Sequence, residues 1–208
     1  MSVPKHTSPM HTFEKFFPTE AVEYCFELWK KHNFKFIISK KRSSKLGDYR
    51  YSFVDKSHTI TVNGDLNKFS FTVTFIHEVA HLVAGVEYGR KKLPHGTEWK
   101  ATFKSLMLPI LHNKVFPPDV LVPLQLYLKN AGASSCSDPQ LLKALQQYDH
   151  WHDGLVYLSD IKEGELFEFN KRVFRKHELR RTRALCVDVS NDKRYLIAEV
   201  AKVSRKTV

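Results

Sequence analysis

The feature that most constrains this chain is a long apolar stretch at residues 69–86, which is interrupted by His77, Glu78 and His81. Its β-branched residues would suit a strand. However, the stretch is longer than a usual buried strand, and this length favours a helix. Because an element that is apolar on most sides is normally buried, we expect this helix to lie in the core.

The spacing of the polar residues in this helix predicts a metal site. His77 and His81 are four residues apart, so they lie one helical turn from each other on the same face and can bind one metal ion. Glu78 is rotated away from this pair, so it need not be a ligand and can instead deprotonate a water molecule. The alternative is two hydrogen-bonded core histidines beside a chance carboxylate. Burying all three groups without partners is costly, which favours zinc.

A catalytic zinc site needs a third protein ligand and one open position. Three residues beyond His81 are candidates, namely Glu87, His95 and Glu98. Glu87 would point away from the histidine face and stands where a metzincin carries a histidine, so that arrangement is excluded. His95 lies between a proline and a glycine, which suit a tight turn back to the metal. We therefore favour His95, with Glu98 as the alternative.

The pattern of helices and strands predicts an α+β fold. We expect a flexible arm at residues 1–12, then a main domain at residues 13–148 in which three strands follow one helix and precede the histidine helix. The expected helices cover residues 19–32, 69–86, 97–107, 117–128 and 138–149, with N-caps at Thr97, Asp119 and Asp138, and the expected strands cover residues 34–39, 40–53 and 58–64. The last strand is either a sheet edge along the active-site cleft or an ordinary internal strand.

The sequence changes character near residue 150. Short runs with a period of two, separated by turn residues, predict a small, basic all-β domain of four or five strands at residues 149–208. Residues 130–137 are rich in small and polar residues and are the best candidate for a linker.

Cysteine usage and hydropathy indicate an intracellular protein. Cys25, Cys136 and Cys186 are scattered and form no C-x-x-C pair, so we expect reduced thiols and no cysteine-built zinc site. The N-terminus has no apolar segment of signal-peptide length, and no run reaches the length of a membrane span. We therefore expect a cytoplasmic protein without a membrane partner, and its charge is compatible with association with the nucleoid.

The net charge of +11 favours a polyanionic partner such as nucleic acid. Two basic segments are candidate DNA-binding surfaces, with the residues Lys40, Lys41, Arg42 and Lys45 in one and Lys171, Arg172, Arg175, Lys176, Arg180, Arg181 and Arg183 in the other. In the second segment, alternate residues of a strand would face one side and form a basic face for phosphates. The alternative is a solvated strand edge that charge protects from aggregation.

The motif His-Glu-x-x-His followed by the sequence HGTEWK resembles the SprT-like (Spartan-related) zinc metallopeptidase family. An Arg and a Leu-Gly before one strand, and an Asn at the end of the next, are also similar to that family. The resemblance covers roughly residues 13–148. It implies a zincin-like fold, one zinc ion held by His77, His81 and His95, and Glu78 as the general base. Many members carry a cysteine-rich zinc ribbon after this domain, which this chain lacks.

The resemblance therefore implies a zinc metalloendopeptidase that acts on protein substrates, in particular DNA-bound or DNA-crosslinked proteins in DNA-protein crosslink repair. We expect the basic β domain to replace the ribbon as the nucleic-acid anchor. The alternative is a nucleic-acid-binding or transcription-associated protein in which the zinc is structural or the activity vestigial. An intact Glu78 favours the enzyme, because a structural site does not need that carboxylate.

Overall fold

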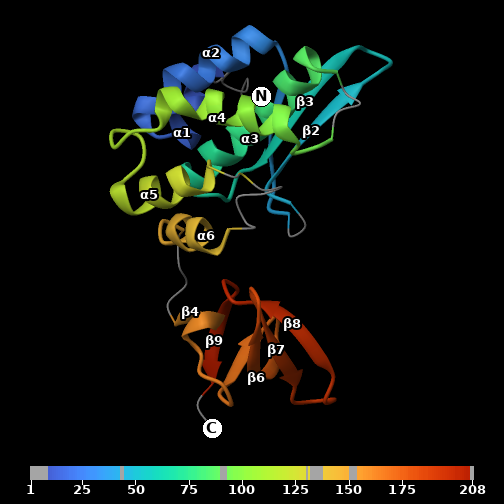
Figure 1. The fold of residues 1–208 in the computed structure, drawn as a ribbon, viewed down its shortest axis with the longest axis vertical. Helices are drawn as coiled ribbons and strands as arrows, with labels where there is room; N and C mark the ends of the chain where they lie inside the picture. Colours follow the sequence, from blue (N-terminus) through green and yellow to red (C-terminus); the bar gives the residue numbers. More distant parts are fainter. Residues whose placement is uncertain are drawn as a thin grey trace, which may run out of the picture. The chain divides into compact units, whose positions relative to one another are not determined.

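The computed structural model describes residues 9–42, 45–89, 93–129, 131, 138–149 and 154–206. The chain divides into two compact units, Met1–Asp149 and His150–Val208 (Figure 1). The first unit mixes helices with a small sheet, and the second contains one larger sheet and no α-helix among its described residues. The predicted α+β class with an all-β C-terminal region is confirmed.

Six α-helices form most of the described part of the first unit. They are α1 (Pro9–Phe16), α2 (Val22–His32), α3 (Lys68–Glu87), α4 (Thr97–Met107), α5 (Pro118–Tyr127) and α6 (Pro139–Gln146), with short 3-10 turns at Thr19–Ala21 and Leu108–Ile110. Of the expected arm, residues 1–8 lie outside the described residues, whereas the following residues begin α1. The predicted linker also lies outside them, apart from Ala131.

One of the three predicted helix caps is correct. The carboxylate of Asp138 accepts a hydrogen bond of 2.8 Å from the backbone N–H of Leu141, and a proline follows it at the first position of α6. The predictions of Thr97 and Asp119 as caps are wrong, because α4 and α5 begin one or two residues earlier, after Gly96 and Pro117. Asp119 instead lies in the first turn of α5, where its negative charge interacts favourably with the helix dipole.

The sheet of the first unit has three strands, β1 (Lys35–Ser39), β2 (Gly47–Ser52) and β3 (Ser57–Asn63). β3 is the central strand, since it pairs in parallel with β1 and in antiparallel with β2. Of the two readings of residues 58–64, the internal strand is therefore correct and the edge strand is wrong. The edges are β1 and β2.

The helix α3 lies in the core of the first unit. Phenylalanines of α1 and of the loop after it pack against α3, with ring centroids 5.0 Å apart for Phe17 and Phe75 and 5.1 Å apart for Phe17 and Phe71. By length and composition α3 could also cross a membrane, with a mean hydropathy of 1.4, but 72% of that apolar window is buried inside the protein. Its apolar surface is therefore covered by its own unit, as in a core helix.

The second unit is a single six-stranded sheet, where four or five strands were expected. Its strands are β4 (Leu155–Tyr157), β5 (Leu166–Phe169), β6 (Arg172–Arg180), β7 (Arg183–Asp188), β8 (Arg194–Ala198) and β9 (Lys202–Lys206), in the order β4-β9-β5-β6-β7-β8. The additional strand is the three-residue β4, which is too short to show a period of two in the sequence. One side of the sheet buries Phe167, Phe174, Cys186 and Val203.

Candidate metal centre

The helix α3 places two of the predicted ligands and the predicted base. Its N-terminus is held by Asn67, whose side-chain oxygen accepts hydrogen bonds from the backbone N–H groups of Phe69 and Ser70. Three turns further along, His77 and Glu78 are 9% and 7% exposed. Both are therefore polar groups inside an apolar core. Their burial costs free energy unless they are hydrogen-bonded, paired with a charge or bound to a metal.

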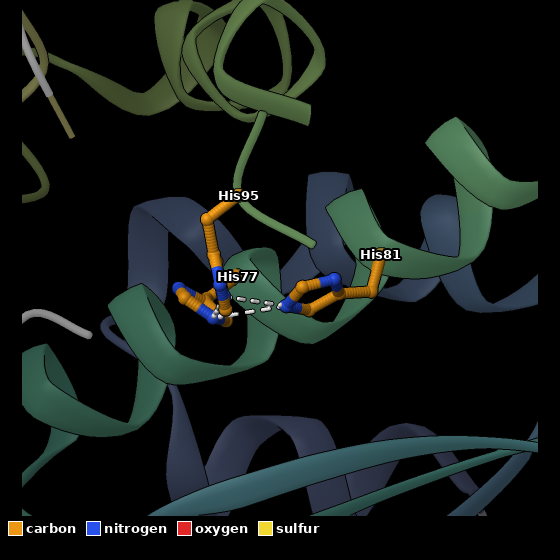
Figure 2. Close-up of side chains that lie close together, drawn as sticks. All are labelled: His77, His81 and His95. Carbon is orange, nitrogen blue, oxygen red and sulfur yellow. Dashed lines mark hydrogen bonds between the residues drawn. The ribbon is translucent and has the colours of Figure 1, made fainter. Parts of the chain in front are cut away.

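The three predicted histidines meet at one point (Figure 2). The Nε2 atoms of His77 and His81 are 3.2 Å apart, those of His77 and His95 are 3.2 Å apart, and those of His81 and His95 are 2.9 Å apart. Three nitrogen ligands of a tetrahedral zinc ion would be separated by about 3.3 Å, given zinc–nitrogen distances of roughly 2.0–2.1 Å. The spacing of this cluster therefore fits one metal ion.

His95 reaches the cluster from a tight turn before α4. The backbone N–H of Gly96 donates to the carbonyl of Leu93 at 3.0 Å, and His95 has a φ of 62°. A proline followed by a residue with positive φ is the pattern of a type II turn. In this turn glycine is preferred at the residue after the proline, which is His95 here. A histidine there costs of the order of 1 kcal/mol, and such strain is typical of functional sites.

The surroundings of the cluster keep its imidazoles neutral. Burial, together with the neighbouring histidines, lowers the pKa of His77 to about 3 and that of His81 to about 4, and burial also lowers the pKa of His95. Neutral imidazoles have a lone pair for a metal. The buried ring of Trp99 lies with its centroid 4.6 Å from His77 and His95 and 5.2 Å from His81, so one side chain supports all three.

Glu78 lies where β2 crosses α3. A Cβ atom added to Gly47 would lie 2.9 Å from Cγ and Oε1 of Glu78 and 2.7 Å from Thr74, so only glycine allows this close approach. Burial and the charge of Asp48 raise the pKa of Glu78 to about 8, while a hydrogen bond from the backbone of Tyr49 acts in the opposite direction. The carboxylate is thus held beside the cluster by the edge strand of the sheet.

A cavity of about 210 Å³ opens beside His81. Apolar side chains such as Ala84, Leu93 and Trp99 form much of its wall, and Tyr49 and Glu98 also line it. Glu98, the alternative third ligand, lies in this wall and does not belong to the histidine cluster.

Part of the first basic segment is engaged in contacts within the protein, although its sequence suggests a fully exposed basic turn. The Arg42 side chain is 24% exposed, donates a hydrogen bond of 2.8 Å to Asn63 and forms an ion pair with Asp48. Lys45 pairs with the same carboxylate at 3.1 Å. Arg42 therefore anchors the loop before β2, whereas Lys40 and Lys41 are exposed.

The second basic segment is divided between the interior and the surface. The ammonium group of Lys176 is buried, donates to the carbonyl of Leu158 at 2.8 Å and pairs with Glu199 at 2.9 Å, so it does not face solvent. Arg172 pairs with the buried Asp188. The exposed members are Lys171, Arg175, Arg180, Arg181 and Arg183.

Gly47 and Trp99 are site residues that the sequence reasoning did not identify as such. Trp99 had one available signal, namely its position four residues after His95. Gly47 had one available signal, namely a glycine at the start of a strand, which often marks a close approach of two backbones.

Comparison with known proteins gives one family match. The model of the SprT-like family matches residues 13–117, which is half of the chain and includes the three histidines and Glu78. Searches of curated proteins and of solved structures found no match.

Proposed function

The chain belongs to the SprT-like family, and from this premise we propose that it is a zinc-dependent metallopeptidase with a zincin-like core. His77, His81 and His95 would hold one zinc ion per chain. The observation that carries this proposal is the convergence of the three Nε2 atoms to within 3.2 Å of one another. The buried carboxylate of Glu78 follows His77 directly on α3.

Glu78 is the proposed general base and acid of peptide hydrolysis. A bound zinc ion supplies a Lewis acid that polarises the peptide carbonyl and lowers the pKa of water toward 7. Glu78 takes a proton from the attacking water and then returns it to the leaving amine. The tight contact with Gly47 fixes the position of its carboxylate, and the low polarity around it strengthens its attraction for that proton.

The substrate is proposed to bind as an added strand on β2. β2 is an edge of the sheet, because it is the last strand in the order β1-β3-β2 and pairs with β3 along one side. Main-chain pairing at an edge holds an extended peptide with little dependence on its sequence. Gly47 and Tyr49 bring this edge to Glu78, so a peptide paired with β2 would pass the metal centre.

Replacing Glu78 by Gln separates this proposal from a structural zinc site. We expect Glu78→Gln to keep one equivalent of zinc and the fold but to lose peptide hydrolysis by at least about 100-fold, the lower range for a general base. Zinc content is measured by mass spectrometry. Activity is measured as cleavage of an unstructured protein and as self-cleavage, each with and without single-stranded DNA. Glu87→Gln, at the exposed end of the same helix, is the matched control. Full activity in Glu78→Gln would remove the carboxylate from the mechanism.

We further propose that the enzyme is intracellular and acts on DNA-bound or DNA-crosslinked proteins. The net charge of +11 and the exposed arginines at the β6–β7 turn support an association with DNA. Arg181 lies in this turn with a φ of 62°, and Arg180 and Arg183 flank it as a cross-strand pair. The second candidate is a nucleic-acid-binding or transcription-associated protein in which the zinc is structural or the activity vestigial. The buried Glu78 favours the enzyme, since a purely structural zinc site has no need for that carboxylate.

A further inference from the structure

The C-terminal unit contains a cavity of about 370 Å³. It is bordered by the β5–β6 turn, by the start of β6 and by β8. Three aromatic rings line it, those of Phe169, Phe174 and Tyr195, together with Leu196 and Ala201. Phe169 and Tyr195 are only partly buried, so their rings are open to a ligand. This volume is sufficient for a flat aromatic group of the size of a nucleobase.

An arginine is fixed at the wall of this cavity. The guanidinium of Arg172 lies 4.7 Å from the ring centroid of Tyr195 and 5.2 Å from that of Phe174, and it donates a hydrogen bond of 2.9 Å to the Tyr195 hydroxyl. Asp188, which is 1% exposed, pairs with the same terminal nitrogen of the guanidinium, Nη2. Because its partners hold it before any ligand arrives, this planar donor is preorganised and loses little entropy on binding.

The charge around the cavity selects among ligands. Lys171 is exposed and follows the lining residue Asn170 at the β5–β6 turn. A cationic ligand, such as a methylated ammonium group, would meet Arg172 already placed over the rings and is disfavoured. A ligand that combines a flat apolar ring, hydrogen-bond acceptors and a negative charge is favoured, and a nucleotide unit has all three.

We propose that this cavity binds an unstacked base of single-stranded nucleic acid, with Phe169 and Tyr195 as the stacking platform and Arg172 as donor to the base edge. The inference rests on the nucleic-acid association proposed above and adds a specific contact to it. Bases of an intact duplex are paired and stacked, so they cannot enter the cavity. Exposed Lys171 would contact a flanking phosphate.

A comparison of oligonucleotides with and without bases tests this contact. Fluorescence anisotropy measures binding of the full chain to oligo(dT) and to an abasic strand of the same length and charge. We expect about tenfold tighter binding of oligo(dT), as for one stacked base. Phe169→Ala and Tyr195→Ala should each reduce this ratio to near one, whereas Leu179→Ala, which removes an exposed side chain of the same sheet outside the cavity, should leave it unchanged. Oligo(rU) distinguishes RNA from DNA as the source of the base.

A second measurement does not depend on the folding of the variants. Oligo(dT) that carries one 5-iodouracil is photo-crosslinked to the unmodified full chain, and the crosslinked peptide is identified by mass spectrometry. We expect a peptide that contains Phe169 or Tyr195. Equal affinity for the two strands, or crosslinks confined to residues 9–149, would overturn the cavity as a base site while leaving the DNA association intact. Binding of neither strand would overturn both the cavity and the association, but not the peptidase.

Discussion

The helix α3 and the strand β6 both combine ionisable and apolar residues, and the fold treats them differently. In α3, His77 is buried and His81 is half-buried, and their imidazoles are directed at one point, as the helical spacing predicted. In β6, alternation directs Lys176 inward, and a register irregularity between residues 176 and 179 then interrupts the alternation. The comparison teaches that spacing predicts which residues share a face, whereas tertiary packing decides whether that face is buried or exposed.

The two regions also differ in what compensates their buried polar groups. Lys176 has its compensation within the protein, from Glu199 and the carbonyl of Leu158. The histidine cluster contains only neutral nitrogens that face one another, and three such lone pairs need a metal ion or protons between them. The variants described next test this difference, from the largest expected effect to the smallest.

The largest effect is expected from removing the third ligand. His95→Asn keeps a residue that tolerates positive φ but removes the imidazole, so the turn should persist while zinc affinity falls by more than about 100-fold, beyond the range for outer-shell partners. Zinc content after dialysis against a competing chelator measures this. Glu98→Gln is the control and should keep its zinc. The reverse result would make Glu98 the third ligand.

The next effect concerns the buried lysine of β6. Lys176→Met leaves Glu199 partly buried without its partner, and breaking such a pair costs up to about 3–5 kcal/mol in the free energy of unfolding. Hydrogen exchange of the amides in residues 154–206 measures this loss in the full chain. Most of it should be recovered in the double variant Lys176→Met/Glu199→Gln.

Lys171→Met is the matched control, because Lys171 is exposed at the β5–β6 turn, between the cavity-lining residues Asn170 and Arg172. It should leave the free energy of unfolding within about 0.5 kcal/mol of that of the parent. If both variants were equally stable, Lys176 would be a surface residue, as the sequence alone suggested.

A smaller effect is expected at the contact between β2 and α3. Gly47→Ala places a methyl group 2.9 Å from the Glu78 carboxylate, so either the strand or the carboxylate must move. We expect destabilisation of about 1–3 kcal/mol and a fall in kcat of up to about 100-fold with zinc retained. Kinetics on a quenched peptide would show it. Unchanged kcat would mean that this contact does not position the base.

The smallest effect concerns the exposed part of the β6–β7 hairpin. Replacing Arg180, Arg181 and Arg183 by Glu should weaken DNA binding and lower the slope of log affinity against log salt by about 0.7–0.9 for each lost phosphate contact. Activity on a short free peptide should stay nearly intact, because no metal ligand is changed. The control carries Glu at Lys30, Lys31 and Lys35 and has the same net charge. Equal slopes in the parent and the arginine variant would make this hairpin a solvated edge and would direct attention to Lys40 and Lys41.

Most of the metal centre and the outline of the fold could be predicted from the sequence. The predicted bounds of α3 differ from the observed ones by only one residue at each end. They could be predicted because an apolar run of this length indicates its own local structure. Strand order could not be predicted, since pairing of β3 with both β1 and β2 is a non-local choice that no local pattern encodes. Two of the three cap positions were wrong for a similar reason, because the first helical residue depends on how the preceding loop packs.

The sequence by itself determined which chemistry this chain can offer, because the spacing of His77, Glu78 and His81 fixes their directions on any helix. Only the tertiary structure decided that His95 completes the cluster, that Gly47 lets an edge strand reach Glu78, and that Lys176 belongs to the interior. The physical reason is the range of the forces involved. Helix geometry acts over four residues, whereas burial and ion pairing depend on residues that are distant in the chain and meet only after folding.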